Sequence, residues 1–101
     1  TAQPATPLGY SVGEWEGETL VIKTTRIDWP ISDRSGVPQS ADAVHVERFT
    51  PSADGRTMTS ELISTDPVYL IGSPVRTGSY SWLPGREIEP YECVQWERKE
   101  Q

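Results

Sequence analysis

His45 and Glu47 are the residues whose types and spacing best suit chemistry. His45 is the only histidine, so it is the only side chain of the type that exchanges protons near neutral pH. In a β-strand, residues two apart point to the same face, and a carboxylate beside an imidazole can orient the ring. The pair therefore suits proton transfer, with His45 as base and Glu47 or Tyr91 assisting. The commoner reason for such spacing is a structural histidine whose ring nitrogens are satisfied by hydrogen bonds.

Cys93 is the only cysteine, which excludes an internal disulfide and a cysteine-rich zinc site. Paired with His45 it would form a nucleophile and base. The nearby Glu89 and Glu92 disfavour the thiolate, however, and an unreactive buried thiol is the better interpretation.

Metal binding has little support in the sequence. One histidine and scattered carboxylates give no close ligand spacing for zinc, and no calcium-binding loop of the EF-hand type is present. Asp28, Asp33 and Asp42 could bind calcium, but a solvated loop explains them as well. We therefore expect no metal and no cofactor.

The aromatic residues are the most informative group. Four Trp and four Tyr exceed what so small a core can hold, so some rings must line a concavity or a surface. Rings beside carboxylate acceptors suit a neutral or cationic organic ligand, or the face of a sugar. The alternative is that most of the rings form the core of a protein with few aliphatic residues. We predict stacking by Trp15, Trp29, Tyr69 and Trp82, with His45, Glu47 and Arg48 as polar anchors.

Composition limits the classes of partner. The 101 residues suffice for one domain, and the net charge of -6 disfavours binding to a nucleic-acid backbone. No apolar run approaches the roughly 20 residues that a membrane-spanning helix needs. We expect residues 1–7 to be a flexible lead and residues 8–101 to form a single β domain.

The elements that must position these residues are strands, because Thr, Ser and Val abound and no apolar stripe of helical period is found. We predict an all-β fold, a small antiparallel barrel or sandwich of about six to seven strands, lipocalin-like or open. The predicted strands are Tyr10–Glu16, Thr19–Ile27, Ala43–Thr50, Arg56–Thr65, Val68–Ile71, Val75–Leu83 and Arg86–Glu97.

Turn residues fix the hairpins. Gly17 predicts a tight turn that needs a positive φ, and residues 52–55 suit a second hairpin. If Phe49 pairs with Met58, Glu47 lies opposite Ser60 and His45 opposite Leu62.

Two further features concern the sheet and its long loop. Arg48 would come within diagonal reach of Glu61 on the reverse face, away from His45. The loop Asp28–Asp42 holds Trp29 and Ile31, which are too apolar to be left in water, so we expect it to fold over one end of the sheet.

Residues Leu8–Ile22 read Leu-Gly-Tyr-Ser-Val-Gly-Glu-Trp-Glu-Gly-Glu-Thr-Leu-Val-Ile. This block resembles a group of uncharacterised, mostly exported bacterial proteins with the motif Gly-Tyr-Ser-x-Gly-x-Trp-Glu-Gly-Asp-Thr-Leu-Val-Val. The segments His45–Phe49, Asp66–Tyr69 and Glu89–Cys93 are similar to later landmarks of that group. The resemblance implies an all-β module and export, so a secreted or periplasmic location, but no activity.

We therefore expect a small exported β module that binds a small organic ligand in an aromatic-lined cleft, with the loop Asp28–Asp42 as its rim. One alternative is a cofactor-free enzyme doing proton transfer, such as an isomerase, cyclase or hydrolase, with His45 as base. A second is a carbohydrate-binding module. A third is a module that assembles as a homodimer through an edge strand at Arg86–Glu97.

Overall fold

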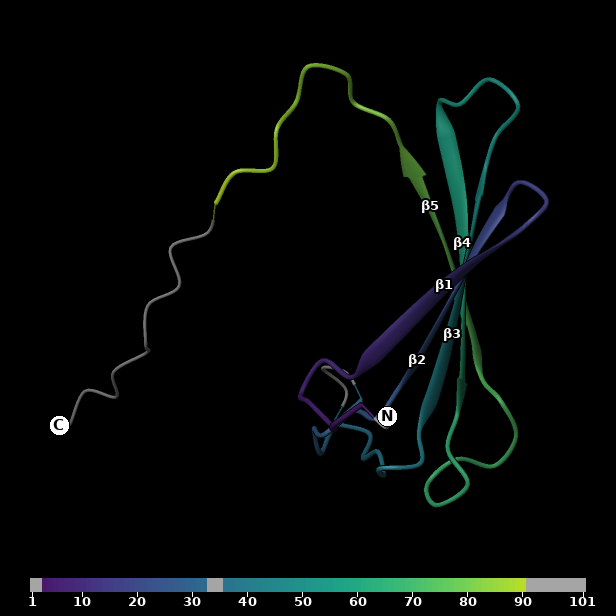
Figure 1. Ribbon diagram of the computed structural model, residues 1–101. Coiled ribbons are helices and arrows are strands. Elements are labelled where there is room, and N and C mark those ends of the chain that lie inside the picture. The colour runs from purple at the N-terminus through teal and green to yellow at the C-terminus, as the bar shows by residue number, and fades with distance from the viewer. Residues whose placement is uncertain (1–2, 33–35, 91–101) are drawn as a thin grey trace, which may run out of the picture.

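A computed structural model describes residues 3–32 and 36–90, which form one antiparallel sheet and no helix (Figure 1). The all-β prediction is confirmed. The strands lie side by side in chain order, so each pairs with the strand that precedes or follows it. They are β1 (Tyr10–Glu16), β2 (Thr19–Thr25), β3 (Val44–Pro51), β4 (Thr57–Thr65) and β5 (Val75–Ser81).

Both predicted hairpins are present. Gly17 has a φ of 60° in the two-residue turn between β1 and β2, where a side chain would be strained. Between β3 and β4, the Asp54 carboxylate accepts hydrogen bonds from the Ser52 hydroxyl at 2.6 Å and the Arg56 N–H at 3.0 Å. These two bonds, that from Ser52 first, lower the pKa of Asp54 below its ordinary value of 3.8.

The register between β3 and β4 differs from the predicted one by two residues. Phe49 lies opposite Ser60 rather than Met58, because β3 continues to Pro51 and Pro51 takes the place opposite Met58. A shift of two residues changes the partners but keeps every side chain on its face. The predicted division into two faces is therefore right although the predicted pairs are wrong.

The two faces are named after their β3 residues. The His45 face carries His45, Glu47 and Phe49, and the Arg48 face carries Arg48 with its neighbours Val44 and Val46. Pairing extends the His45 face across the sheet through Ser11, Gly13, Trp15, Leu20, Ile22, Thr24, Ser60, Leu62, Ser64, Arg76, Gly78 and Tyr80.

The predicted strand Val68–Ile71 is not formed, and the predicted strand Arg86–Glu97 is described only in part. Residues 68–71 belong to a turn, because the Asp66 carboxylate accepts the Val68 N–H at 3.0 Å and the Asp66 carbonyl accepts the Leu70 N–H at 3.0 Å. Residues 86–90 contain no strand, and the rest of the predicted segment Arg86–Glu97 lies outside the described residues, as do Tyr91 and Cys93. Among the described strands, β5 therefore forms the edge of the sheet on the β4 side.

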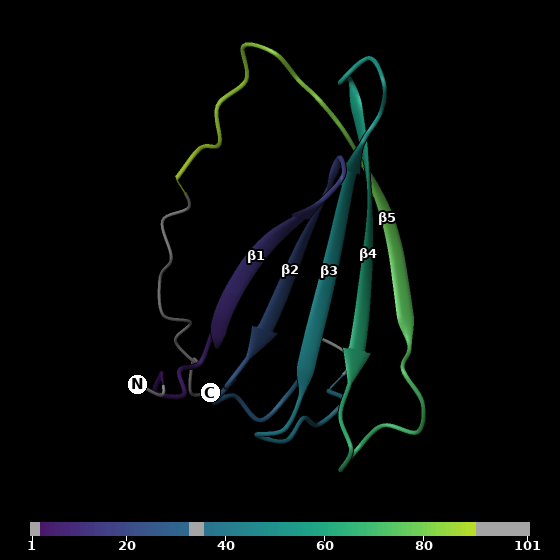
Figure 2. The ribbon, with the colours of Figure 1, turned by 45° about the vertical axis from the view of Figure 1, so that its right-hand side comes forward.

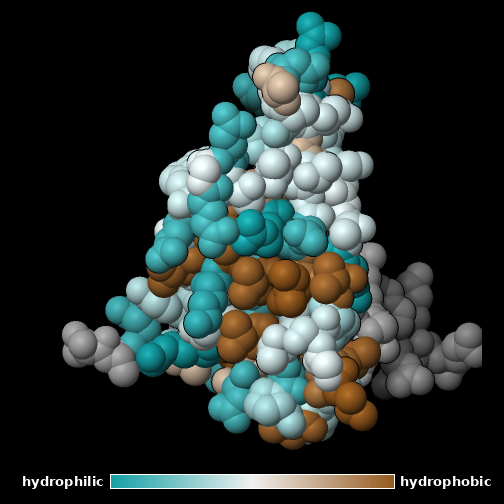
Figure 3. Space-filling model, turned by 90° about the vertical axis from the view of Figure 1, so that its right-hand side faces the viewer, coloured by the Kyte–Doolittle hydropathy of each residue, from teal (hydrophilic) through white to brown (hydrophobic). Residues whose placement is uncertain are grey.

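The described strands form an open sheet, with β1 and β5 as its two edges (Figure 2). Closure into a barrel stays a prediction. Among the described residues, Ala43 is the only hydrophobic one that is buried. The residues of the five strands are half-buried or exposed. Figure 3 shows apolar side chains gathered in the lower half of the face it displays, at the end that carries the 26–43 and 66–74 connections in Figure 1. The part of the chain that the structure describes has no helix long and apolar enough to span a membrane.

The segment before β1 is joined to the end of β2. Thr6 donates its N–H to the Arg26 carbonyl at 3.1 Å and accepts the Asp28 N–H at 2.7 Å. Gly9 permits this close approach, because a Cβ there would lie 2.7 Å from Cγ1 of Ile27 and its φ is 79°. Residues 3–9 therefore form one wall at the end of the sheet where the long loop begins.

Candidate functional site

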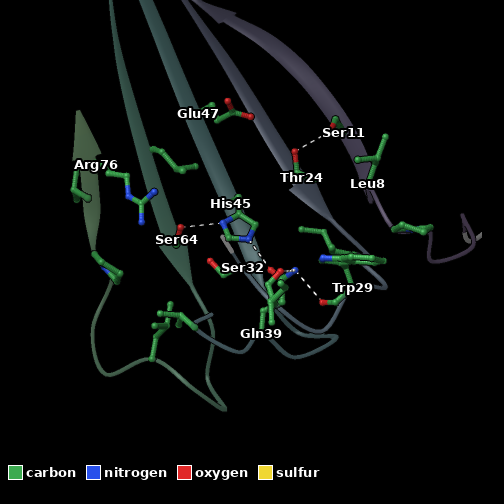
Figure 4. A pocket seen from close by; sticks show the side chains of 18 residues that line it. Leu8, Ser11, Thr24, Trp29, Ser32, Gln39, His45, Glu47, Ser64 and Arg76 are labelled. Atoms are coloured by element: carbon green, nitrogen blue, oxygen red, sulfur yellow. Dashed lines mark hydrogen bonds between the residues drawn. The ribbon is translucent and has the colours of Figure 1, made fainter. Parts of the chain in front are cut away.

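A cavity of about 670 Å³ lies between the His45 face and the long β2–β3 loop (Figure 4). The predicted folding of this loop over one end of the sheet is confirmed. The sheet contributes polar and apolar side chains, and the loop contributes mainly apolar ones. From the sheet come Ser11, Thr24, His45, Glu47, Leu62, Ser64, Val75 and Arg76, and from the segments around it Pro7, Leu8, Ile27, Trp29, Ile31, Ser32, Val37, Gln39, Leu70 and Pro74.

A row of polar side chains crosses four strands at the floor of the cavity. The register places Ser11, Thr24, His45 and Ser64 side by side on β1 to β4. Ser11 Oγ and Thr24 Oγ1 are 2.8 Å apart, and His45 Nδ1 and Ser64 Oγ are 2.9 Å apart. Hydroxyl groups thus flank the only histidine on both sides.

Gln39 fixes the protonation pattern of His45. Its amide nitrogen donates to the carbonyl oxygens of Trp29 and Ile31, both at 3.0 Å, so both amide hydrogens are used. Its oxygen, which can only accept, lies 3.1 Å from Nε2 of His45. Nε2 therefore carries a hydrogen, and in the neutral ring Nδ1 accepts the hydroxyl hydrogen of Ser64.

The predicted orienting role of Glu47 is not what the geometry shows. Glu47 and His45 share a face and both line the cavity, but Gln39 and Ser64 hold the ring. As a base, His45 is directed toward the Ser64 hydroxyl, because Nε2 is already a donor. Tyr91, the other predicted assistant, lies outside the described residues.

Glu47 lies on the same face as His45, two residues further along β3. Leu62 lies opposite it on β4, and Arg76 lies opposite Leu62 on β5. Glu47 is half-buried, and no side chain of residues 3–32 or 36–90 forms a hydrogen bond or ion pair with its carboxylate. The cavity therefore presents a carboxylate without a protein partner in the described chain.

Asp66 anchors the far end of the loop. It is 2 % exposed, and its carboxylate accepts the N–H of Ser40 at 2.7 Å and the hydroxyl of Ser40 at 2.6 Å. Burial favours the neutral acid, but the hydrogen bonds from Ser40, Val68 and Tyr69 outweigh it and lower the pKa of Asp66 below 3.8. The loop is thus tied to the sheet both at Ser40 and at Gln39.

Of the four predicted stacking rings, Trp29 alone lines the cavity. Trp15 lies on the same face but opposite Leu20, toward the other end of the sheet, and Tyr69 lies in the 66–74 turn. Trp82 follows the last residue of β5. All of these rings are more than half exposed. The described lining is therefore mainly aliphatic and polar, with one aromatic wall.

Arg48 lies on the opposite face, because alternation along β3 separates it from His45. Its guanidinium lies 3.0 Å from the Glu16 carboxylate and 3.9 Å from that of Glu61. The predicted pairing with Glu61 is confirmed. The predicted role as a cavity anchor is not, since a second cation, Arg76 on β5, lines the cavity instead.

Sequence reasoning missed Gln39, Ser64, Arg76 and Asp66. Only Asp66 carried a signal, because Asp followed by Pro marks a turn in which the aspartate accepts backbone N–H groups.

In the ranges 3–32 and 36–90, no group of three or more His, Cys, Asp or Glu side chains is placed to hold a metal ion. Comparison with protein-family models, curated proteins and solved structures finds no match for this chain.

Proposed function

We propose that this protein binds a small organic molecule in the cavity between the His45 face and the long loop. The observation that carries the proposal is the cavity itself. Its volume of about 670 Å³ lies within the range of roughly 300–1,000 Å³ that is typical of small-molecule sites. Such sites combine apolar walls with a few convergent polar groups, and this lining does so.

The lining suggests how the ligand lies. Leu62 and the loop residues Trp29 and Ile31 offer apolar surface, whereas the row through His45 offers polar groups on the sheet side. A ligand with its apolar body against the loop and its polar group against the sheet would contact both kinds of surface.

The hydrogen bonds of Gln39 and Ser40 support a site that is formed before the ligand arrives. A preformed loop lowers the entropy cost of binding. On the resemblance of residues Leu8–Ile22 we also propose export, to the periplasm or the medium. We propose further that the open sheet is the curved wall of a small barrel or sandwich.

A second candidate function is a hydrolase without a cofactor. The observation that favours it is the chain of hydrogen bonds from the Ser64 hydroxyl to His45 and from His45 to Gln39. A base that is hydrogen-bonded to a hydroxyl and oriented by a third group can activate that hydroxyl as a nucleophile. Loss of turnover with retained binding in His45→Ala would identify this function.

Thermal unfolding with a library of small apolar, aromatic and sugar compounds tests the binding proposal. A ligand at a hundred times its Kd stabilises the folded state by about 2.7 kcal/mol, which raises Tm by about 10 °C in a domain of this size. Leu62→Trp fills the cavity from its floor and should abolish the shift. Thr59→Trp is the matched control, because Thr59 lies on the same strand and the opposite face. A library without a single stabilising compound would refute the proposal.

A further inference from the structure

The unpartnered carboxylate of Glu47 indicates the charge of the ligand. It lies half-buried between Ile22 on β2 and Leu62 on β4, two apolar neighbours that offer it no hydrogen bond. A carboxylate that is partly removed from water gains most from a cation or from strong hydrogen-bond donors. Within the described chain no group fills that role.

The polar groups around His45, in the row of side chains next to that of Glu47, are committed as donors. Both amide hydrogens of Gln39 go to carbonyl oxygens, and Nε2 of His45 donates to Gln39. The hydroxyl of Ser64 donates to the neutral ring of His45, which leaves its oxygen as an acceptor. A ligand that brings its own donors therefore fits this part of the cavity better than one that brings acceptors.

Arg76 is the one cation on the described cavity wall, and it lies on β5, two strands from Glu47. Neighbouring strands are about 4.8 Å apart, so the two backbones are roughly 10 Å apart. The net charge of -6 favours the approach of a cation.

Trp29 gives the loop side of the cavity an aromatic surface. Figure 4 shows its ring on the loop, to the lower right of Glu47 in this view. A tryptophan face attracts organic cations and also packs against apolar groups. A carboxylate on one wall and an indole on the other are the two groups that an ammonium ion with an apolar body would contact.

We propose that the cavity selects an organic ammonium ion, with Glu47 as its counter-ion and Trp29 against its apolar body. This inference rests on the proposed function, because it names the class of ligand for the same cavity. The ammonium group donates to the Glu47 carboxylate, and the body lies along Leu62 toward the loop.

Three compounds with the same body separate the charge from the shape: 4-phenylbutylamine, 4-phenylbutan-1-ol and 4-phenylbutyrate. Their affinities for the full chain are measured by calorimetry at low and at physiological salt. A charge-assisted hydrogen bond predicts that the amine binds about tenfold to a hundredfold more tightly than the alcohol, with the carboxylate weakest. Added salt should weaken the binding of the amine and leave the binding of the alcohol unchanged.

Glu47→Gln keeps the shape of the side chain and removes its charge, so it should bring the amine to the affinity of the alcohol. Glu61→Gln is the matched control, because this substitution removes the same charge from the opposite face of the sheet. Circular dichroism confirms that both variants fold.

The outcomes distinguish the two proposals. If none of the three compounds binds and the wider library also fails, the cavity is not a binding site and both proposals fall. If amine and alcohol bind equally, or Glu47→Gln leaves the preference for the amine intact, the ammonium inference is wrong and the cavity stands. Tightest binding of the carboxylate would likewise overturn the inference and would assign the recognition to Arg76.

Discussion

Replacing Gln39 by leucine should open the folded conformation of the long loop without unfolding the sheet. The substitution keeps the size of the side chain and removes three hydrogen bonds, to the carbonyl oxygens of Trp29 and Ile31 and to His45. The two carbonyl contacts are exposed, so water replaces them and each is worth only about 0.5 kcal/mol. The His45 contact is partly buried and is worth about 1 kcal/mol. The loss is therefore about 2 kcal/mol, or about 30-fold in the equilibrium between the folded and the opened loop.

Native-state hydrogen exchange measures this equilibrium directly. The reporters are the N–H groups of Ser32 and residue 39, which donate to the Val37 and Pro30 carbonyl oxygens at 2.7 and 3.1 Å. Their protection should fall about 30-fold, whereas the N–H groups in the β2–β3 ladder keep theirs. Ser32→Ala is the control, because it changes the same loop and leaves these backbone bonds intact. A fall of less than about threefold, or an equal fall in loop and sheet, would show that Gln39 does not hold the loop.

Three further predictions concern other parts of the fold. Folding lowers the pKa of Asp66, so the contribution of its carboxylate to stability is complete above about pH 3.8 and is lost as pH falls through the lower folded value. The Asp66→Asn variant should therefore lose less stability than the parent between pH 5 and pH 2, as measured by urea unfolding. Arg48→Met should lower the free energy of unfolding by less than about 1 kcal/mol, and by less again in 1 M salt, because the ion pairs of Arg48 are partly exposed. A larger decrease in denaturant titrations would mean a stronger pair with Glu16. Arg26 has a φ of 57°, so Arg26→Gly should be about 1 kcal/mol more stable than Arg26→Ala, and equal melting temperatures would contradict the strain.

The sheet could be predicted because its signals are local. The alternation in β3 placed His45 and Arg48 on opposite faces, and Gly17 marked the turn between β1 and β2. The pairing of Phe49 was wrong because turn length decides it, and the sequence does not show whether Pro51 still belongs to the strand. The segment at Val68 has strand-like residues, but the Asp66 carboxylate accepts its N–H and bends it into a turn.

The site was only partly predictable, because its polar contacts join residues that are distant in sequence. His45, Glu47 and Trp29 were found from residue type and position. Ser64 meets His45 only through the register of two strands, and Gln39 meets it only once the loop has folded back. A glutamine in a loop and a serine in a strand of mixed polar and apolar residues carry no local sign of such roles.

The strict chain order of the sheet has a consequence for how the protein folds. The pairs β1–β2, β3–β4 and β4–β5 are each closed by a short connection, whereas β2–β3 is closed by the long one, residues 26–43. Closing a longer segment costs more entropy, and contacts between distant residues form more slowly. We therefore expect the two halves of the sheet to form before they join. That same closure creates the cavity, so the site for the ligand is complete only when the two halves have joined.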